Sequence, residues 1–189
     1  MNIQTPFWAL LLAGGMLFFS CSQDHIFYTI QYDKVLNKNA VVPGSPSKIV
    51  GLGDALYVGS NAVYRYKKES PEEGWRRLPV QPGGKKIMDL AGTEASSGKK
   101  YLYALVMQGV ELSDALLYRK DPETEEPWTR VGNPGFAIQS IHGAGDTLFV
   151  GARSGGSSVL VYVDDSGGSP TLTQVPGVSG MLKAAASYS

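Results

Sequence analysis

Cys21 is the only cysteine of the chain and therefore its only thiol. A single thiol cannot form an internal disulfide, so another role is expected for it. Histidines are also few, because His25 and His142 are the only two. The chain shows no spacing of His, Cys and Asp that is typical of a metal site, and no Ser-His-Asp set can be assigned. The sequence therefore predicts no catalytic residue, no metal site and no cofactor, and it predicts that His142 lies at a turn or rim.

Acidic and glycine-rich segments are the next candidates for a site. The acidic runs 69–73 and 121–126 lack the regular alternation of Asp that a calcium loop requires. The glycine-rich segments 151–158 and 165–170 lack the lysine of a phosphate-binding loop. We expect the acidic runs to lie in turns between strands and the glycine-rich segments to form hairpin tips.

The charge balance bears on the class of partner. The chain has 189 residues, with 17 basic and 17 acidic side chains, so its formal net charge is zero. Proteins that bind nucleic acid usually carry a basic excess, so this balance argues against a nucleic-acid partner. The apolar fraction of 43% and the charged fraction of 18% fit a globular chain with one domain.

An apolar run precedes Cys21. It extends from Phe7 to Ser20, and the first charged side chain after it is Asp24. A membrane-spanning helix needs about 20 apolar residues, so this run is short for one. Its length fits the hydrophobic core of a secretory signal, which predicts a signal peptide over residues 1–20 in helical form.

The junction Ser20-Cys21 resembles the signal of bacterial lipoproteins, in which cleavage precedes a cysteine whose thiol carries a diacylglycerol. The sequence departs from that family at Phe18, where leucine is usual, and has no Lys or Arg before the apolar run. The resemblance implies a palmitate-bearing anchor at Cys21 and a location in the bacterial cell envelope, on the outer membrane or the periplasmic face. Residues 21–47 would form a tether that contains a strand-like segment over 26–36. The alternative is an uncleaved signal anchor in which Cys21 has no role.

The rest of the chain repeats itself. Leu56-Tyr57, Leu102-Tyr103 and Leu148-Phe149 are separated by 46 residues in both intervals. Repeats of about 40–50 residues are typical of β-propellers among β architectures. The predicted units are 48–85, 86–136 and 137–177, with the start of a fourth over 178–189. Each unit contains short strands rich in Val, Leu and Tyr, bounded by turn residues. The strands are predicted over 48–52, 55–60, 62–68, 75–80, 86–92, 100–109, 115–121, 128–133, 137–143, 147–153, 158–164 and 171–177.

The apolar strands must be buried by one another. A four-stranded sheet with two apolar faces cannot bury both alone, but copies of the sheet can stack. The second strand of each unit is the most apolar, so we expect it to be central and buried on both faces. Trp75 and Trp128 open the outermost strands and are predicted to pack between units, and Leu172 lies near the same place in the third unit.

These repeats resemble the propeller units of the sialidase and kelch-like superfamily. Residues 70–75, "SPEEGW", look like a degenerate form of the Asp-box of sialidases. The catalytic arginine cluster and tyrosine nucleophile of that family cannot be placed in this chain. The resemblance therefore implies an all-β fold of about three four-stranded antiparallel blades, a partial β-propeller, and does not imply sialidase activity.

About three units are too few for a closed ring, which needs at least four. Three explanations remain open: a truncated product, completion of the ring by self-association of two chains, or an all-β fold that is not a propeller.

Two functions remain open as well. The first is a non-enzymatic, membrane-tethered module that binds a protein, peptide or glycan. The second is a fragment of a propeller hydrolase or lyase whose catalytic residues lie in missing blades. We favour the binding module, because function resides in sites and no catalytic site was found.

Overall fold

The computed structural model describes residues 41–84, 86–95, 97–111, 114–165 and 169–179. Cys21, His25, the signal segment and the strand-like segment 26–36 lie outside these residues. The described part contains twelve strands and one short 3-10 helix, η1. The elements are β1 (Ile49–Leu52), β2 (Ala55–Gly59), β3 (Val63–Lys67), η1 (Pro71–Glu73), β4 (Arg76–Arg77), β5 (Lys86–Glu94), β6 (Lys100–Met107), β7 (Ala115–Lys120), β8 (Thr129–Arg130), β9 (Ala137–Ala144), β10 (Thr147–Ser154), β11 (Ser157–Asp164) and β12 (Thr171–Ser179).

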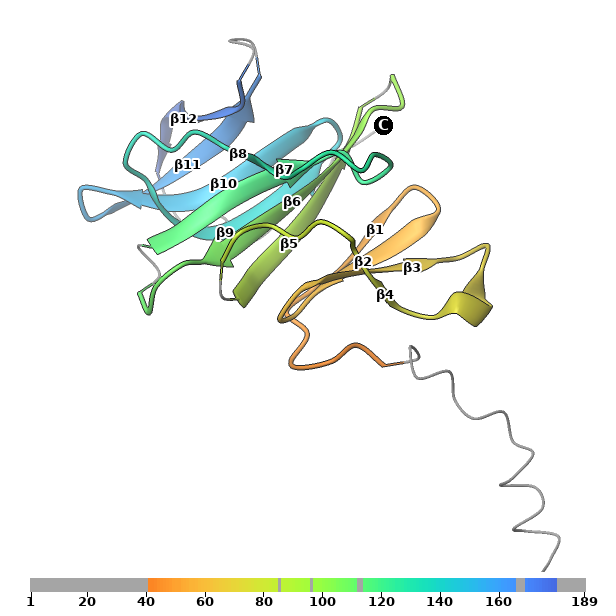
Figure 1. Ribbon diagram of the computed structural model, residues 1–189. Helices are drawn as coiled ribbons and strands as arrows, with labels where there is room; N and C mark the ends of the chain where they lie inside the picture. Colours follow the sequence, from red (N-terminus) through yellow and green to blue (C-terminus); the bar gives the residue numbers. More distant parts are fainter. Residues whose placement is uncertain (1–40, 85, 96, 112–113, 166–168, 180–189) are drawn as a thin grey trace, which may run out of the picture. The chain divides into compact units, whose positions relative to one another are not determined.

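The strands form three four-stranded antiparallel sheets, each from consecutive strands: the first sheet β1–β4, the second sheet β5–β8 and the third sheet β9–β12. The expectation of an all-β chain with three such sheets is confirmed for the described residues. Figure 1 shows β5 between β1 and β9, and β5 contacts both of these strands. The first strands of the three sheets thus form one inner edge. The sheets do not close into a ring.

The repeat is visible in the strand register. In each sheet the leucine of the repeat in the second strand lies opposite a glycine of the first strand. The pairs are Leu56 with Gly51, Leu102 with Gly92, and Leu148 with Gly143. The leucines therefore occupy like positions in three like sheets, as the constant spacing predicts.

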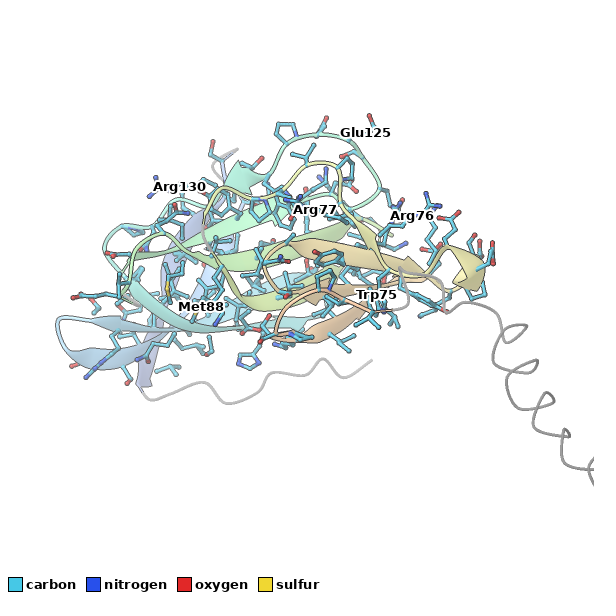
Figure 2. The ribbon with its side chains drawn as sticks, turned by 60° about the horizontal axis from the view of Figure 1, so that its bottom comes forward. Trp75, Arg76, Arg77, Met88, Glu125 and Arg130 are labelled. Carbon is cyan, nitrogen blue, oxygen red and sulfur yellow. The ribbon has the colours of Figure 1, made fainter. Side chains whose placement is uncertain are left out.

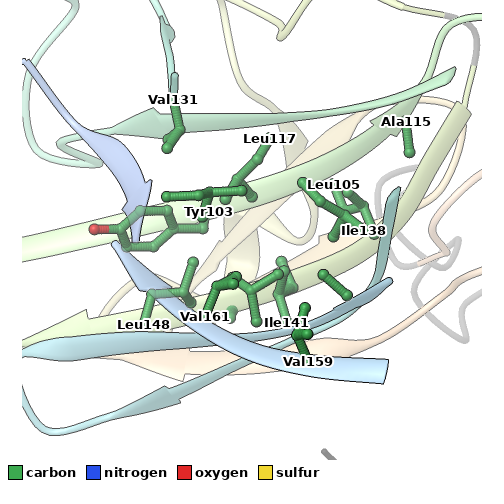
Figure 3. Close-up of a cluster of buried hydrophobic side chains, with 14 residues drawn as sticks. Tyr103, Leu105, Ala115, Leu117, Val131, Ile138, Ile141, Leu148, Val159 and Val161 are labelled. Atoms are coloured by element: carbon green, nitrogen blue, oxygen red, sulfur yellow. The ribbon is translucent and has the colours of Figure 1, made fainter. Parts of the chain in front are cut away.

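Apolar side chains fill both spaces between the sheets. Leu90, Leu102 and Val106 of the second sheet pack with Leu52 and Val63 of the first. The opposite face of the second sheet packs on the third sheet, and Figure 3 shows this cluster. Its labelled members are Tyr103, Leu105, Ala115, Leu117, Val131, Ile138, Ile141, Leu148, Val159 and Val161. Strand β6 is buried on both faces from Leu102 to Val106, which confirms the prediction for the second strand of that unit.

Polar links join the sheets as well. The Ile87 amide donates to the Ser60 carbonyl at 3.2 Å, and the Glu94 amide donates to the Gly145 carbonyl at 2.8 Å. At the outer edge the indole Nε1 of Trp128 donates to the Val80 carbonyl at 3.1 Å. Such bonds satisfy backbone groups that would otherwise be buried without a partner. Trp128 therefore packs between the first and second sheets, as predicted.

Trp75 behaves differently from Trp128 although the two are equivalent in the repeat. It lies against Tyr66, with ring centroids 5.5 Å apart, and packs with Val58, Tyr64 and Val42 on the face of the first sheet that points away from the second. The prediction that it packs between units is wrong. Trp128 meets the preceding sheet, whereas no described sheet precedes the one that holds Trp75.

The chain after Gly177 also differs from expectation. A fourth unit was expected from residue 178, but Val178 and Ser179 continue β12, and Ser179 pairs with Val159 of β11. Residues 180–189 lie outside the described part.

The outermost strands of the first two sheets are short. Strands β4 and β8 have only two residues each, and Arg76, Arg77 and Arg130 on them are exposed (Figure 2). The acidic runs 69–73 and 121–126 lie in the connections before these strands, as predicted. Gly155 and Gly156 have positive φ angles and form the tip between β10 and β11, which confirms a hairpin there.

Candidate functional site

An ion pair lies at the inner edge, where the first strands meet. The Lys48 ammonium is 3.3 Å from Oδ1 of Asp89 and donates to the Ile141 carbonyl at 3.2 Å. The other carboxylate oxygen, Oδ2, accepts from the Ile141 amide at 3.2 Å. These three residues come from the three different sheets. The group thus ties the sheets together at their inner edge.

A β-bulge directs Asp89 toward this point. The pairing of β5 with β6 shifts between Ile87 and Asp89, so Met88 has no opposite residue. An extra residue of this kind re-aims the side chains that follow it. The same shift occurs in β9, where Gln139 is the extra residue before Ser140. The bulge is therefore a repeated feature of the second and third units.

A shallow hollow of about 310 Å³ lies beside the ion pair. Gly51, Gly92 and Gly143 line it together with Lys48 and His142. Burial, followed by the charge of Lys48, lowers the pKa of His142, while Asp89 opposes this effect. His142 lies within β9, opposite Phe149 and two residues before the strand ends, so the part of the prediction that places it in a turn is wrong.

A larger hollow, of about 500 Å³, opens between the first and second sheets at the end where β1 turns into β2. Charged side chains of both signs line it. They include Asp54, Arg65 and Lys67 from the first sheet and Lys100 and Glu123 from the second. Lys100 binds Glu123 at 3.0 Å. The hollow thus offers an open, polar surface between two sheets.

Tyr57 and Arg65 form the wall of this hollow on the first sheet. They lie directly opposite each other in β2 and β3. Burial raises the pKa of Tyr57, and the charge of Arg65 and a hydrogen bond from its guanidinium oppose this rise. Tyr57 is 3% exposed, so Arg65 is held against a rigid, buried partner.

The site residues expected from the sequence are only partly described. Cys21 and His25 lie outside the described residues. Within the described ranges no group of three or more His, Cys, Asp or Glu side chains is placed to hold a metal ion. Over the same ranges no helix combines the length and the apolar composition needed to cross a membrane.

The comparisons with known proteins return no relative. No protein-family model matches this chain, and no curated protein or solved structure matches it either.

Sequence reasoning singled out His142 and the acidic runs that contain Glu69 and Glu123, but it missed the other residues that line the two hollows. An acid between apolar residues in "KIMDLAG" was a signal for Asp89, and alternation within "AVYRYKK" was a signal that Arg65 faces the same side as Val63 and Lys67. Neither signal shows which side chain of another sheet lies opposite, so neither could have identified the contact.

Proposed function

We propose that this protein is a lipid-anchored, non-enzymatic binding module of the bacterial cell envelope, and that its three sheets are blades of a partial β-propeller. Cys21 carries the lipid, and the sheets, which follow it in the sequence, present the binding surface. The partner is a protein, peptide or glycan.

The observation that supports a binding role is the hollow between the first and second sheets. Tyr57 and Val63, on the strands that form its wall, are buried in the cluster between the two sheets, and Arg65 is hydrogen-bonded to Tyr57, so both polar groups are held in place before any ligand arrives. Preorganised polar groups in a concave site favour binding because little conformational entropy is lost when the ligand enters. The support for the anchor comes from the sequence around Cys21.

Metabolic labelling with a clickable palmitate analogue tests the anchor. The chain is expressed in a bacterium as wild type, as Cys21→Ala and as the neighbouring control Ser22→Ala. We expect label and membrane association in the wild type and in the control, and loss of both in Cys21→Ala. Equal labelling of all three chains would refute lipidation at Cys21.

The packing of the three sheets on one another also suggests self-association of the chain. Phe149, Leu160 and Tyr162 of the third sheet are half-buried on the face away from the second sheet. The equivalent face of the second sheet is covered by the third, so a second copy of the chain would cover this face with its first sheet. Light scattering on the purified chain should give a mass above that of the monomer, and a mass of about one monomer at all concentrations would refute it.

A further inference from the structure

Tyr57 and Arg65 have direct counterparts in the second sheet. Tyr103 and Arg119 lie opposite each other in β6 and β7, as Tyr57 and Arg65 do in β2 and β3. In both sheets the arginine side chain is hydrogen-bonded to the tyrosine. Burial raises the pKa of Tyr103 to about 12, which keeps its hydroxyl protonated. Each pair faces the next sheet along the chain.

In the second sheet the arginine of this pair binds a carboxylate. Nη1 of Arg119 lies 2.5 Å from both carboxylate oxygens of Asp165, which follows β11 in the third sheet. The guanidinium also lies over the ring of Tyr101, 4.3 Å from its centroid. The Arg119 side chain is 14% exposed and the Asp165 side chain 49%, so the arginine end of the ion pair is shielded from water whereas the carboxylate end is not.

Around Arg65 of the first sheet, neither the aromatic ring nor the carboxylate that contacts Arg119 has a counterpart. Ala55 occupies the position that Tyr101 has in the second sheet. Pro122 of the second sheet occupies the position of Asp165 in the third, because Pro122 lies three residues after the partner of Tyr103 and Asp165 lies three residues after the partner of Phe149. The hollow of about 500 Å³ occupies that space. Among the described residues, no carboxylate lies within ion-pair distance of Arg65.

The neighbouring charges do not replace the missing carboxylate. Glu123 follows Pro122, but it binds Lys100 at 3.0 Å. The Glu123 amide donates to Asp121 Oδ1 at 2.9 Å, which helps to hold this loop in a turn. Lys67 adds a second cation beside Arg65, while Asp54 and Glu69 also line the hollow and suit the amide N–H groups of a bound chain.

We infer that Arg65 and Tyr57 bind the carboxylate of an Asp or Glu side chain presented by a partner polypeptide. The internal counterpart is itself an aspartate side chain at the end of a strand, which favours a polypeptide over an acidic sugar. The site rests on the proposed binding function and specifies its chemistry: the partner supplies the acid that Asp165 supplies within the chain.

NMR titration of the full chain in detergent tests this site. The probe is acetyl-Gly-Glu-Gly-amide, and the matched controls are acetyl-Gly-Gln-Gly-amide and glucuronate. We expect the Glu peptide to shift the Arg65 Nε resonance with saturation in the millimolar range, and the Gln peptide to cause no saturable shift. Equal responses to both peptides would overturn the site, and saturable binding of glucuronate without the Glu peptide would overturn the polypeptide assignment.

Variants then connect the response to the hollow. Arg65→Gln should weaken binding of the Glu peptide about tenfold or more, whereas Arg77→Gln, at an exposed position that pairs with Tyr64 and not with Arg65, should bind as the wild type does. Ala55→Tyr introduces the ring that the second sheet has at Tyr101. The ring would take up space in the hollow, so this variant should also bind the Glu peptide more weakly. Because Arg65→Gln removes the Arg65 Nε resonance, binding to this variant is followed by the resonances of the other residues that line the hollow. Unchanged binding would contradict the inference, whether or not Ala55→Tyr folds.

A gain of binding provides the converse test. Tyr101→Ala combined with Asp165→Ala empties the equivalent place in the second sheet and should create a second site for the Glu peptide, reported by the Arg119 Nε resonance. No response of a folded double variant would overturn the equivalence of the two sheets. The lipid plays no part in these measurements, so a chain that is labelled at Cys21 but does not bind the peptide refutes this site alone.

Discussion

Lys48 and Asp89 occupy the same position of the repeat and bind each other across two sheets. Each stands three residues before the glycine that lies opposite the repeated leucine. Their charged groups are 3.3 Å apart. The third unit has Ser140 at this position. One repeat position thus carries a cation, an anion and a hydroxyl in turn, and the opposite charges link the first two sheets at the inner edge.

The Asp89 carboxylate should contribute measurably to stability. In Asp89→Ala the Ile141 amide loses its carboxylate acceptor, so we expect a loss of about 1–3 kcal/mol in the free energy of unfolding. Glu73→Ala is the control, because its ion pair with Arg76 lies at the surface, with side chains 37% and 61% exposed, and should contribute about 0–1 kcal/mol. Urea denaturation followed by circular dichroism measures both. Similar small losses would show that the link between sheets is not stabilising.

Gly143 lies against the backbone of Gly92, and this approach limits what can replace it. A Cβ at Gly143 would overlap the Gly92 carbonyl oxygen, whereas a Cβ at Gly51 would meet only Leu56 Cδ2, at 3.8 Å. Gly143→Ala should therefore destabilise the protein by about 1–3 kcal/mol, and Gly51→Ala should change stability by about 0.5 kcal/mol or less. Thermal unfolding of the two variants checks this, and equal melting temperatures would contradict the close approach of the sheets.

The repeated leucines should differ in their contribution to stability, because their burial differs. Leu102 and Leu148 are 0% and 1% exposed, whereas Leu56 is only half-buried. Leu102→Ala should cost about 2–5 kcal/mol through the lost apolar contact and the cavity. Leu56→Ala should cost about half of that or less. Denaturant titration provides the values, and a larger loss for Leu56→Ala would mean that its face is covered in solution.

His142 should make stability depend on pH in the mildly acidic range. Its folded pKa is lowered from the ordinary value of 6.5, chiefly by burial and next by Lys48, while Asp89 opposes this. The unfolded chain then binds the proton more readily, so this contribution is present above the ordinary pKa and is lost as the pH falls from there toward the folded pKa. His142→Gln should flatten the stability curve in that window, and an unchanged slope in the variant would assign the effect to other groups.

Much of the strand pattern was available from the sequence. Alternation and turn residues are local properties, and they predicted the strands and their grouping into three sheets. The constant spacing of Leu56, Leu102 and Leu148 also predicted that they occupy like positions. The prediction for Trp75 was wrong because packing depends on the neighbouring sheet. Trp75 and Trp128 are equivalent in the repeat, but among the described residues only Trp128 has a preceding sheet to pack on.

The sequence alone determined the strands, the repeat and the apolar faces that make stacking favourable, because these follow from the order of side chains along one segment. The tertiary structure decided which repeated positions meet. Lys48 finds Asp89, Arg119 finds Asp165, and Arg65 faces a hollow, although the two arginines occupy the same place in their sheets. The physical reason is that an ion pair between sheets depends on the next sheet's loop, and neither periodicity nor spacing within one unit contains that information.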